Sequence, residues 1–215
     1  MQKIKAIIFD LDGTLGNTLP LCIKAFKSSV EPLINRVVPD EEIIATFGPS
    51  EEGTIMKLVP EHYEKGLAGY LHQYKILHSM CPHPFDGIKE LLIYLQGKSV
   101  KLAMVTGKGK HSTDISLQYF NIEPFFEIVE TGSVNGPRKT EGIQCVLKNW
   151  PGIQKDEIVY VGDAVSDIEA SRKAGVPVIA AAWAETADPD QLKQYTPDRI
   201  FYTVADFSRW VYSVV

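Results

Sequence analysis

The stretch Ala6-Ile7-Ile8-Phe9-Asp10-Leu11-Asp12-Gly13-Thr14 decides how the rest of this 215-residue sequence is interpreted. Its four consecutive apolar residues predict a β-strand that is covered on both faces, as in a parallel sheet. Two acids follow the strand at once. Because ligands of parallel α/β sheets bind beyond the carboxyl ends of the strands, the stretch predicts a functional site that begins at Asp10.

Further apolar runs predict the other strands of this sheet. Three are unbroken and rich in β-branched residues, at 102–105, 158–161 and 178–181, and two weaker runs lie at 128–129 and 200–202. Between the strands, apolar residues recur at helical spacing, as at Ile88, Leu91, Leu92 and Leu95. We therefore predict an α/β fold with a doubly wound, Rossmann-like parallel sheet at its core.

Residues 18–81 follow a different pattern, with two amphipathic helices and no good strand. Apolar residues mark the first helix from Ile23 to Val37 and the second from Tyr63 to Leu77. We predict an inserted helical cap domain over residues 18–81 and a core domain made of residues 1–17 and 82–215. The connectors Gly16-Asn17 and Cys81-Pro82-His83-Pro84 are the predicted hinges of the cap.

Composition limits the classes of partner. The chain has 22 Lys and Arg against 27 Asp and Glu, a net charge of -5, which is unfavourable for binding a nucleic-acid backbone. Its three cysteines form no CxxC pair, and no signal peptide or membrane-spanning run is apparent. We expect a cytoplasmic protein with a small-molecule substrate, without nucleic-acid or membrane partners; protein partners are not indicated.

Polar residues follow the other predicted strands and suggest one shared site. They are Thr106-Gly107, Gly162-Asp163 with Asp167 four residues later, and Lys139 at the start of a helix. Acids gathered with Asp10 and Asp12 would repel one another, and a divalent cation removes that repulsion. Carboxylate oxygens and water suit Mg²⁺.

The remaining groups suit a phosphate. A hydroxyl (Thr106), an ammonium (Lys139) and backbone N–H groups at helix starts are its usual partners. With metal and phosphate neutralised together, an aspartate can attack phosphorus and form an aspartyl-phosphate. A second acid two residues later can protonate the leaving oxygen and then take a proton from water.

These motifs together resemble those of the haloacid-dehalogenase superfamily of hydrolases, and the resemblance covers essentially the whole chain. Asp10-Leu11-Asp12-Gly13-Thr14-Leu15 is similar to its first motif, Thr106 to its second, Lys139 to its third and Gly162-Asp163-Ala164-Val165-Ser166-Asp167 to its fourth. Residues 18–81 lie where the family has a C1-type helical cap. Within the superfamily the layout resembles phosphoglycolate-phosphatase-like and pyrophosphatase-like members.

The resemblance implies a role for each residue. Asp10 would be the nucleophile and a Mg²⁺ ligand, and Asp12 the general acid/base that offers its backbone carbonyl to the metal. Asp163 would ligate Mg²⁺ directly. The phosphoryl group would be held by Thr106, Gly107 and Lys139, and Asp167 would orient Asp163 and Lys139 or a metal-bound water.

The sequence departs from the family pattern at two motifs. At the third, Arg138-Lys139-Thr140-Glu141 replaces the usual Lys-Pro-x-Pro, so Arg138 is the alternative to Lys139. At the second, Gly107-Lys108 follows Thr106, and Lys108 either contacts phosphate or points into solvent. In the cap, the segment 47–53 is either a turn with a helix start or a substrate contact.

Several functions remain open at this point. We favour a Mg²⁺-dependent phosphatase that hydrolyses a small soluble phosphate ester, phosphoglycolate-like or pyrophosphate-like, through an aspartyl-phosphate. One alternative is a phosphomutase of the β-phosphoglucomutase type. Another, from a different class, is a catalytically silent or phospho-signalling binding module. A metal-independent haloacid dehalogenase is less consistent with an acid at position 12.

Overall fold

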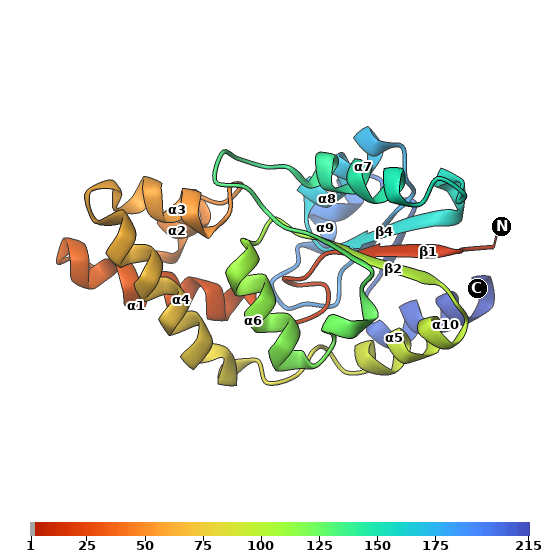
Figure 1. Cartoon of the computed structure of the whole chain (residues 1–215), viewed down its shortest axis with the longest axis horizontal. Coiled ribbons are helices and arrows are strands. Elements are labelled where there is room, and N and C mark those ends of the chain that lie inside the picture. Colours follow the sequence, from red (N-terminus) through yellow and green to blue (C-terminus); the bar gives the residue numbers. More distant parts are fainter. Residues whose placement is uncertain (1–2) are drawn as a thin grey trace.

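The computed structural model describes residues 3–215 as a six-stranded parallel sheet with helices on both faces and further helices at one end (Figure 1). The strand order is β3-β2-β1-β4-β5-β6. The strands are β1 (Ala6–Phe9), β2 (Lys101–Val105), β3 (Ile128–Glu130), β4 (Ile158–Gly162), β5 (Val178–Ala181) and β6 (Arg199–Phe201). All six predicted strands are present, and the predicted α/β doubly wound fold is confirmed.

Two buried clusters explain why β1 reads as an unbroken apolar run. Ile7 and Phe9 belong to the cluster under α5 (Ile88–Gly97) and α10 (Val204–Val214). Ala6 and Ile8 belong to the cluster under the helices of the opposite face, which are α7 (Lys139–Asn149), α8 (Val165–Ala174) and α9 (Pro189–Gln194). Every residue of β1 is therefore buried, as expected for a central strand of a covered sheet.

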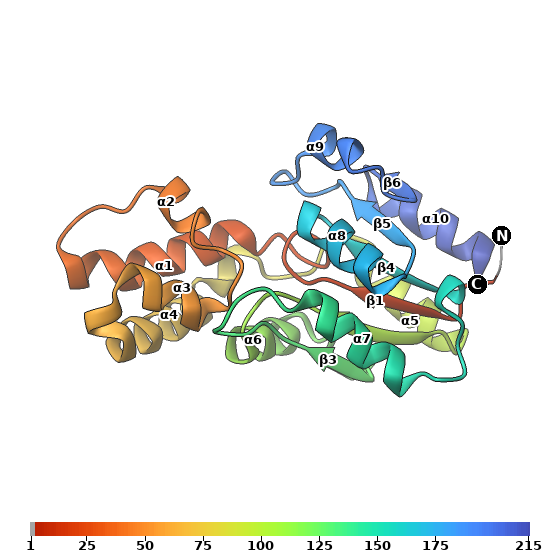
Figure 2. The ribbon, with the colours of Figure 1, turned by 90° about the horizontal axis from the view of Figure 1, so that it is seen from above.

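Helices from the segment between β1 and β2 form one end of the molecule, and the view from above shows the same arrangement (Figure 2). They are α1 (Leu19–Ile34), α2 (Asp40–Ile44), α3 (Glu51–Leu58) and α4 (Tyr63–Leu77). Helix α6 (Lys110–Phe120) contacts α4 from the side of the sheet. Single 3₁₀ turns lie at Pro60–His62, His78–Met80, Glu123–Phe125 and Lys155–Glu157. The domain boundaries given above remain a prediction.

The first helix of this segment ends earlier than its apolar spacing predicts. Asn35 adopts a left-handed conformation (φ 51°) and stops α1 after Ile34, so Val37 lies outside the helix and is 75% exposed. On the second helix that the sequence predicts, Tyr70 and Tyr74 are fully buried, whereas Tyr63 is only partly buried. The buried side chains of the segment are continuous with the cluster that contains Phe9.

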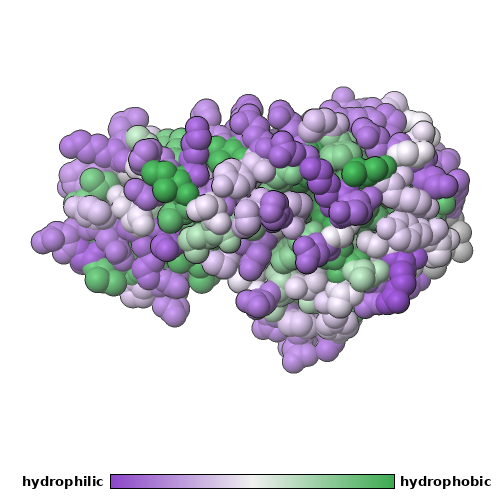
Figure 3. Space-filling model, turned by 90° about the horizontal axis from the view of Figure 1, so that it is seen from below, coloured by the Kyte–Doolittle hydropathy of each residue, from purple (hydrophilic) through white to green (hydrophobic). Residues whose placement is uncertain are grey.

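The surface is predominantly polar on the face seen from below, where apolar residues are interspersed with hydrophilic ones (Figure 3). No helix within residues 3–215 combines the length and the apolar character needed to cross a membrane. Four of the five histidines are exposed. The fifth, His78, is buried with its Nε2 3.0 Å from the Ser116 hydroxyl.

Candidate active site

The order of the strands brings the polar ends of β1, β2 and β4 together. Strand β1 lies between β2 and β4, and Phe9 is in register with Met104 on one side and Val161 on the other. Asp10 follows β1, Thr106 follows β2 and Asp163 follows β4, so all three lie at the same edge of the sheet. The structure thus brings together the groups that the sequence predicts to meet.

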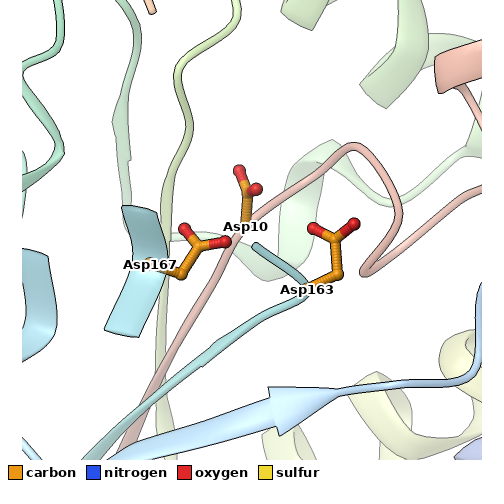
Figure 4. A group of neighbouring side chains, drawn as sticks. All are labelled: Asp10, Asp163 and Asp167. Carbon is orange, nitrogen blue, oxygen red and sulfur yellow. The ribbon is translucent and has the colours of Figure 1, made fainter. Parts of the chain in front are cut away.

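Three carboxylates converge at this edge (Figure 4). One carboxylate oxygen from each of Asp10, Asp163 and Asp167 lies within 4.8 Å of the others. Burial, which exceeds the opposing effect of Lys139, raises the pKa of Asp10 to about 6. Burial also raises the pKa of Asp163 well above its usual range, and the negative charges of Asp167 and Asp10 add to the rise.

Lys139 is the cation of this cluster. It is the first residue of α7, and its Nζ lies 2.8 Å from Asp10 Oδ2 and 2.5 Å from Asp167 Oδ1. Burial acts to lower its pKa, but the two carboxylates outweigh burial and hold it above its ordinary value. Arg138, the alternative from the sequence, instead bonds Glu130 and the Thr131 carbonyl at 3.0 and 2.8 Å.

Both oxygens of Asp167 are occupied by hydrogen bonds. Oδ1 accepts from Lys139 and from the Tyr160 hydroxyl at 2.8 Å, and Oδ2 accepts from the Ala164 N–H at 3.0 Å. Asp167 therefore lies in the first turn of α8, three residues after the N-cap Ala164, rather than at the cap itself. These hydrogen bonds fix the position of the Lys139 ammonium relative to the start of α8.

The acids fit a hard divalent cation. Asp10 Oδ1 is buried and has no hydrogen-bond partner, and Asp163 Oδ1 accepts a long hydrogen bond, of 3.4 Å, from Thr14 Oγ1. The loop also passes very close to Asp163, since a Cβ at Gly13 (φ +74°) would lie 2.0 Å from Asp163 Oδ2. Carboxylate oxygens with few hydrogen bonds, in a buried cluster, are the donors that Mg²⁺ prefers.

Thr106 and Gly107 line the same cavity as Asp10 and Lys139. Thr106 is buried, and its hydroxyl oxygen accepts the Lys108 N–H at 3.2 Å. It does not cap α6, whose N-cap residue is Gly109. The hydroxyl therefore lies beside the carboxylates without a helix-capping role.

Asp12 accepts hydrogen bonds from Thr18 and Lys108 and a longer one, of 3.9 Å, from Cys22 Sγ. The Thr18 hydroxyl donates a short bond to Asp12 Oδ1, and Lys108 Nζ lies 3.2 Å from the same oxygen. Lys108 therefore does not point into solvent: its side chain is only 2% exposed. The sequence offered two interpretations of Lys108, and neither anticipated a bond to Asp12.

Lys108 also contacts three residues of the helical segment. Its Nζ lies 2.9 Å from Cys22 Sγ, 3.6 Å from Glu51 Oε1 and 4.4 Å from the centre of the Tyr74 ring. Burial raises the pKa of Cys22 to about 12, so this cysteine is a thiol rather than a nucleophilic thiolate. No sequence motif points to Cys22, and Glu51 is part of the segment 47–53 for which the sequence left a turn or a substrate contact open.

A cavity of about 650 Å³ opens between the sheet edge and the helical segment. The sheet contributes the charged residues already described. The helical segment contributes mainly apolar side chains, among them Leu19, Phe26 and Phe47. A ligand in this cavity would have its charged end at the strand ends and its other end against α1, α3 and α4.

Comparison with known proteins now decides the family. The family model described as haloacid dehalogenase-like hydrolase matches residues 7–181. The chain belongs to this family. The resemblance drawn from the sequence motifs is therefore confirmed.

Relatives within the haloacid dehalogenase-like hydrolases match almost the whole chain. A pyrophosphatase PpaX of Listeria innocua is 30% identical over 207 residues, covering 95% of this chain and 94% of its own. Another PpaX, of Halalkalibacterium halodurans, is 29% identical over 206 residues and 95% of each chain. A family protein of Streptococcus pneumoniae shares the fold, with a TM-score of 0.76, 24% identity and coverage of 96% and 98%.

Proposed function

We propose that this protein is a Mg²⁺-dependent phosphatase that hydrolyses a small soluble phosphate ester through an aspartyl-phosphate. Hydrolysis of phosphate compounds is the reaction in the names of its relatives. The observation that carries the proposal is Asp10, a buried carboxylate with one oxygen on Lys139 and the other without a partner.

The chain's own residues perform the steps. Asp10 attacks phosphorus, and the ester oxygen leaves with a proton from Asp12. Asp12 then takes a proton from water, whose oxygen attacks the phosphorus and releases inorganic phosphate and the free Asp10 carboxylate. Thr106 and Lys139 donate hydrogen bonds to the phosphoryl oxygens, as does the Gly107 backbone.

The proposed metal ligands are the side chains of Asp10 and Asp163 and the backbone carbonyl of Asp12. Asp167, both of whose oxygens are bonded, positions Lys139 and the start of α8 instead. Mg²⁺ supplies positive charge that offsets the acids and the phosphoryl group together.

The helical segment is the proposed cap. We assign residues 18–81 to a cap domain and residues 1–17 and 82–215 to a core domain. Closure of the cap excludes water while Asp10 reacts, and opening admits water and releases product. We also place the protein in the cytoplasm, a compartment suited to its three free thiols, and expect it to bind neither nucleic acid nor membranes.

The test uses the purified full chain and p-nitrophenyl phosphate. Phosphate release should require Mg²⁺, stop in EDTA and be lost in Asp10→Asn. Acid quenching with a labelled substrate should trap a phospho-enzyme that turns over within seconds. Metal-independent release that survives Asp10→Asn would overturn the proposal. A lifetime of minutes to hours would indicate signalling, and conversion of glucose 1-phosphate to 6-phosphate would indicate a mutase.

A further inference from the structure

Glu51 lies in a set of donors that we call the Glu51 cradle: Lys108 Nζ, the Gly109 N–H, the Ser112 hydroxyl and the Tyr70 hydroxyl. Gly109 and Ser112 make short hydrogen bonds to the Glu51 carboxylate. Tyr70 donates at 3.4 Å and Lys108 Nζ lies at 3.6 Å. Every one of these partners is a donor, and Glu51 is only 7% exposed, so its carboxylate is the acceptor for the whole set.

The cradle has the chemistry of an anion-binding site. It combines an ammonium, two hydroxyls and the N-cap N–H of the 11-residue helix α6, which are groups that bind phosphates and carboxylates. The fit around Glu51 is tight, since a Cβ at Gly109 would lie 2.3 Å from Glu51 Oε2. The protein's own carboxylate therefore fills a site that is built for an anion.

The cradle lies at the leaving-group end of the cavity. Glu51 and Lys108 line the same cavity as Asp10 and Thr106. Lys108 contacts both Glu51 and Asp12, the acid proposed to protonate the leaving oxygen. A second anionic group on the substrate would meet Glu51 there.

The other cations of the cavity wall are not positioned to take a second anion. Lys139 is bonded to two carboxylates and Arg138 to Glu130. Lys173, the remaining cation of the lining within residues 3–215, is exposed on α8. Beside the cradle the wall is apolar, with Phe26 and Phe47 among its residues.

We propose that Glu51 is a specificity-determining residue that excludes substrates with a second anionic group. The substrate is then a phosphate monoester whose leaving group is uncharged. This inference rests on the proposed phosphatase function and departs from the phosphoglycolate-like or pyrophosphate-like substrate expected from the sequence: both of these carry a second anion, and we expect them to be poor substrates.

The wild-type test compares two substrates that differ mainly in one carboxylate. These are 2-hydroxyethyl phosphate, which is neutral beyond the phosphate, and 2-phosphoglycolate. We expect kcat/KM to favour the neutral ester by at least about tenfold, because like charges placed together in a buried site are costly. Pyrophosphate should be equally poor. As inhibitors, methylphosphonate should bind more tightly than methylenediphosphonate.

Variants of Glu51 test its role. Glu51→Ala empties the cradle and should reduce the preference for the neutral ester by about tenfold, and Glu51→Gln should reduce it in the same direction while keeping the side chain's shape. Glu169→Gln, which removes a charge from the exposed rim of the same cavity, is the matched control and should change the ratio less than about threefold.

The outcomes separate the two proposals. If no phosphate ester is hydrolysed, the proposed function fails. If esters are hydrolysed but phosphoglycolate and pyrophosphate react as well as 2-hydroxyethyl phosphate, only the Glu51 inference fails. It also fails if both Glu51 variants lower kcat/KM for the two substrates equally, because a residue that only holds the helical segment in place would leave the ratio of the two values unchanged.

Discussion

The two buried lysines of the cavity, Lys139 and Lys108, have similar electrostatics and different origins. Burial opposes the charge of both lysines, but the carboxylates of Asp10 and Asp167 hold the pKa of Lys139 above its usual range, and Asp12 is foremost among the groups that do the same for the pKa of Lys108. The partners of Lys139 come from the end of β1 and from α8, which covers one face of the sheet. Lys108 is bonded to the loop after β1 and also to α1 and α3.

This difference separates a site fixed by strand order from one that needs the helical segment. The residues of the Lys139 site all come from the end of β1, from α7 and from α8, and none comes from the helical segment. The Lys108 site is complete only while Cys22, Glu51 and Tyr74 pack against the sheet edge. We propose that the Lys139 site performs the chemistry, whereas the Lys108 site is complete only when the helical segment packs against the sheet edge.

The largest expected effect contrasts the two lysines directly. Lys139→Ala should lower kcat/KM for p-nitrophenyl phosphate by about 10²–10³-fold or more, because it removes a buried cation from Asp10, the proposed nucleophile. Lys108→Ala should lower it by only about tenfold, because Asp12 keeps its bond to Thr18. Lys173→Ala, an exposed lysine of the same cavity, is the control and should stay within about threefold. If Lys139→Ala and Lys108→Ala lower kcat/KM equally, the proposed difference between the two lysine sites is wrong.

A smaller effect concerns stability without metal. The folded pKa of Asp10, about 6, lies above its unfolded value of about 4, so ionisation of this group opposes folding. The cost is absent below pH 4, grows between pH 4 and 6, and reaches about 2–3 kcal/mol above pH 6. Asp10→Asn should therefore be more stable than wild type in EDTA at pH 7, by up to this amount.

Urea unfolding at two pH values checks this prediction. The advantage of Asp10→Asn should disappear at pH 4, and added Mg²⁺ should stabilise the wild type more than the variant. If Asp10→Asn is less stable than wild type at pH 7 in EDTA, ionisation of the buried Asp10 carboxylate does not cost the folding free energy predicted here.

The smallest effect concerns Tyr74, which contacts Lys108 from the helical segment. Tyr74→Phe removes one hydrogen bond, 2.8 Å to the Ser116 hydroxyl, and should cost about 1 kcal/mol of unfolding free energy with little change in kcat. Tyr74→Leu also removes the ring over Lys108 and should lower kcat measurably. Loss of kcat in the Phe variant as well would show that the hydroxyl, rather than the ring, matters to the site.

The sheet and the acidic cluster were predictable because both follow from local patterns. An unbroken apolar run such as residues 6–9 indicates a strand that is buried on both faces. Polar residues that follow neighbouring parallel strands lie at the same edge of the sheet and therefore come close together. The choice between Lys139 and Arg138 was not decided by sequence, since it depends on which side chain α7 turns toward Asp10.

The Lys108 site was not predictable in the same way. Its partners Cys22, Glu51 and Tyr74 come from three helices whose packing no local pattern specifies. The end of α1 was misjudged for a related reason, because apolar spacing continues through Val37 while Asn35 has already turned the chain. Contacts between the helical segment and the sheet are therefore the part of the structure that is hardest to predict from the sequence.

The position of β1 in the sheet has a consequence for synthesis of the protein. Asp10 leaves the ribosome early, but its bonding partner Lys139 lies 129 residues further along the chain. Strand β1 has hydrogen-bonded neighbours on both edges only after β4 has been synthesised. A nascent chain therefore carries the Asp10 carboxylate without Lys139 and without a complete pair of neighbouring strands until β4 has been synthesised, so the proposed site cannot assemble before that point.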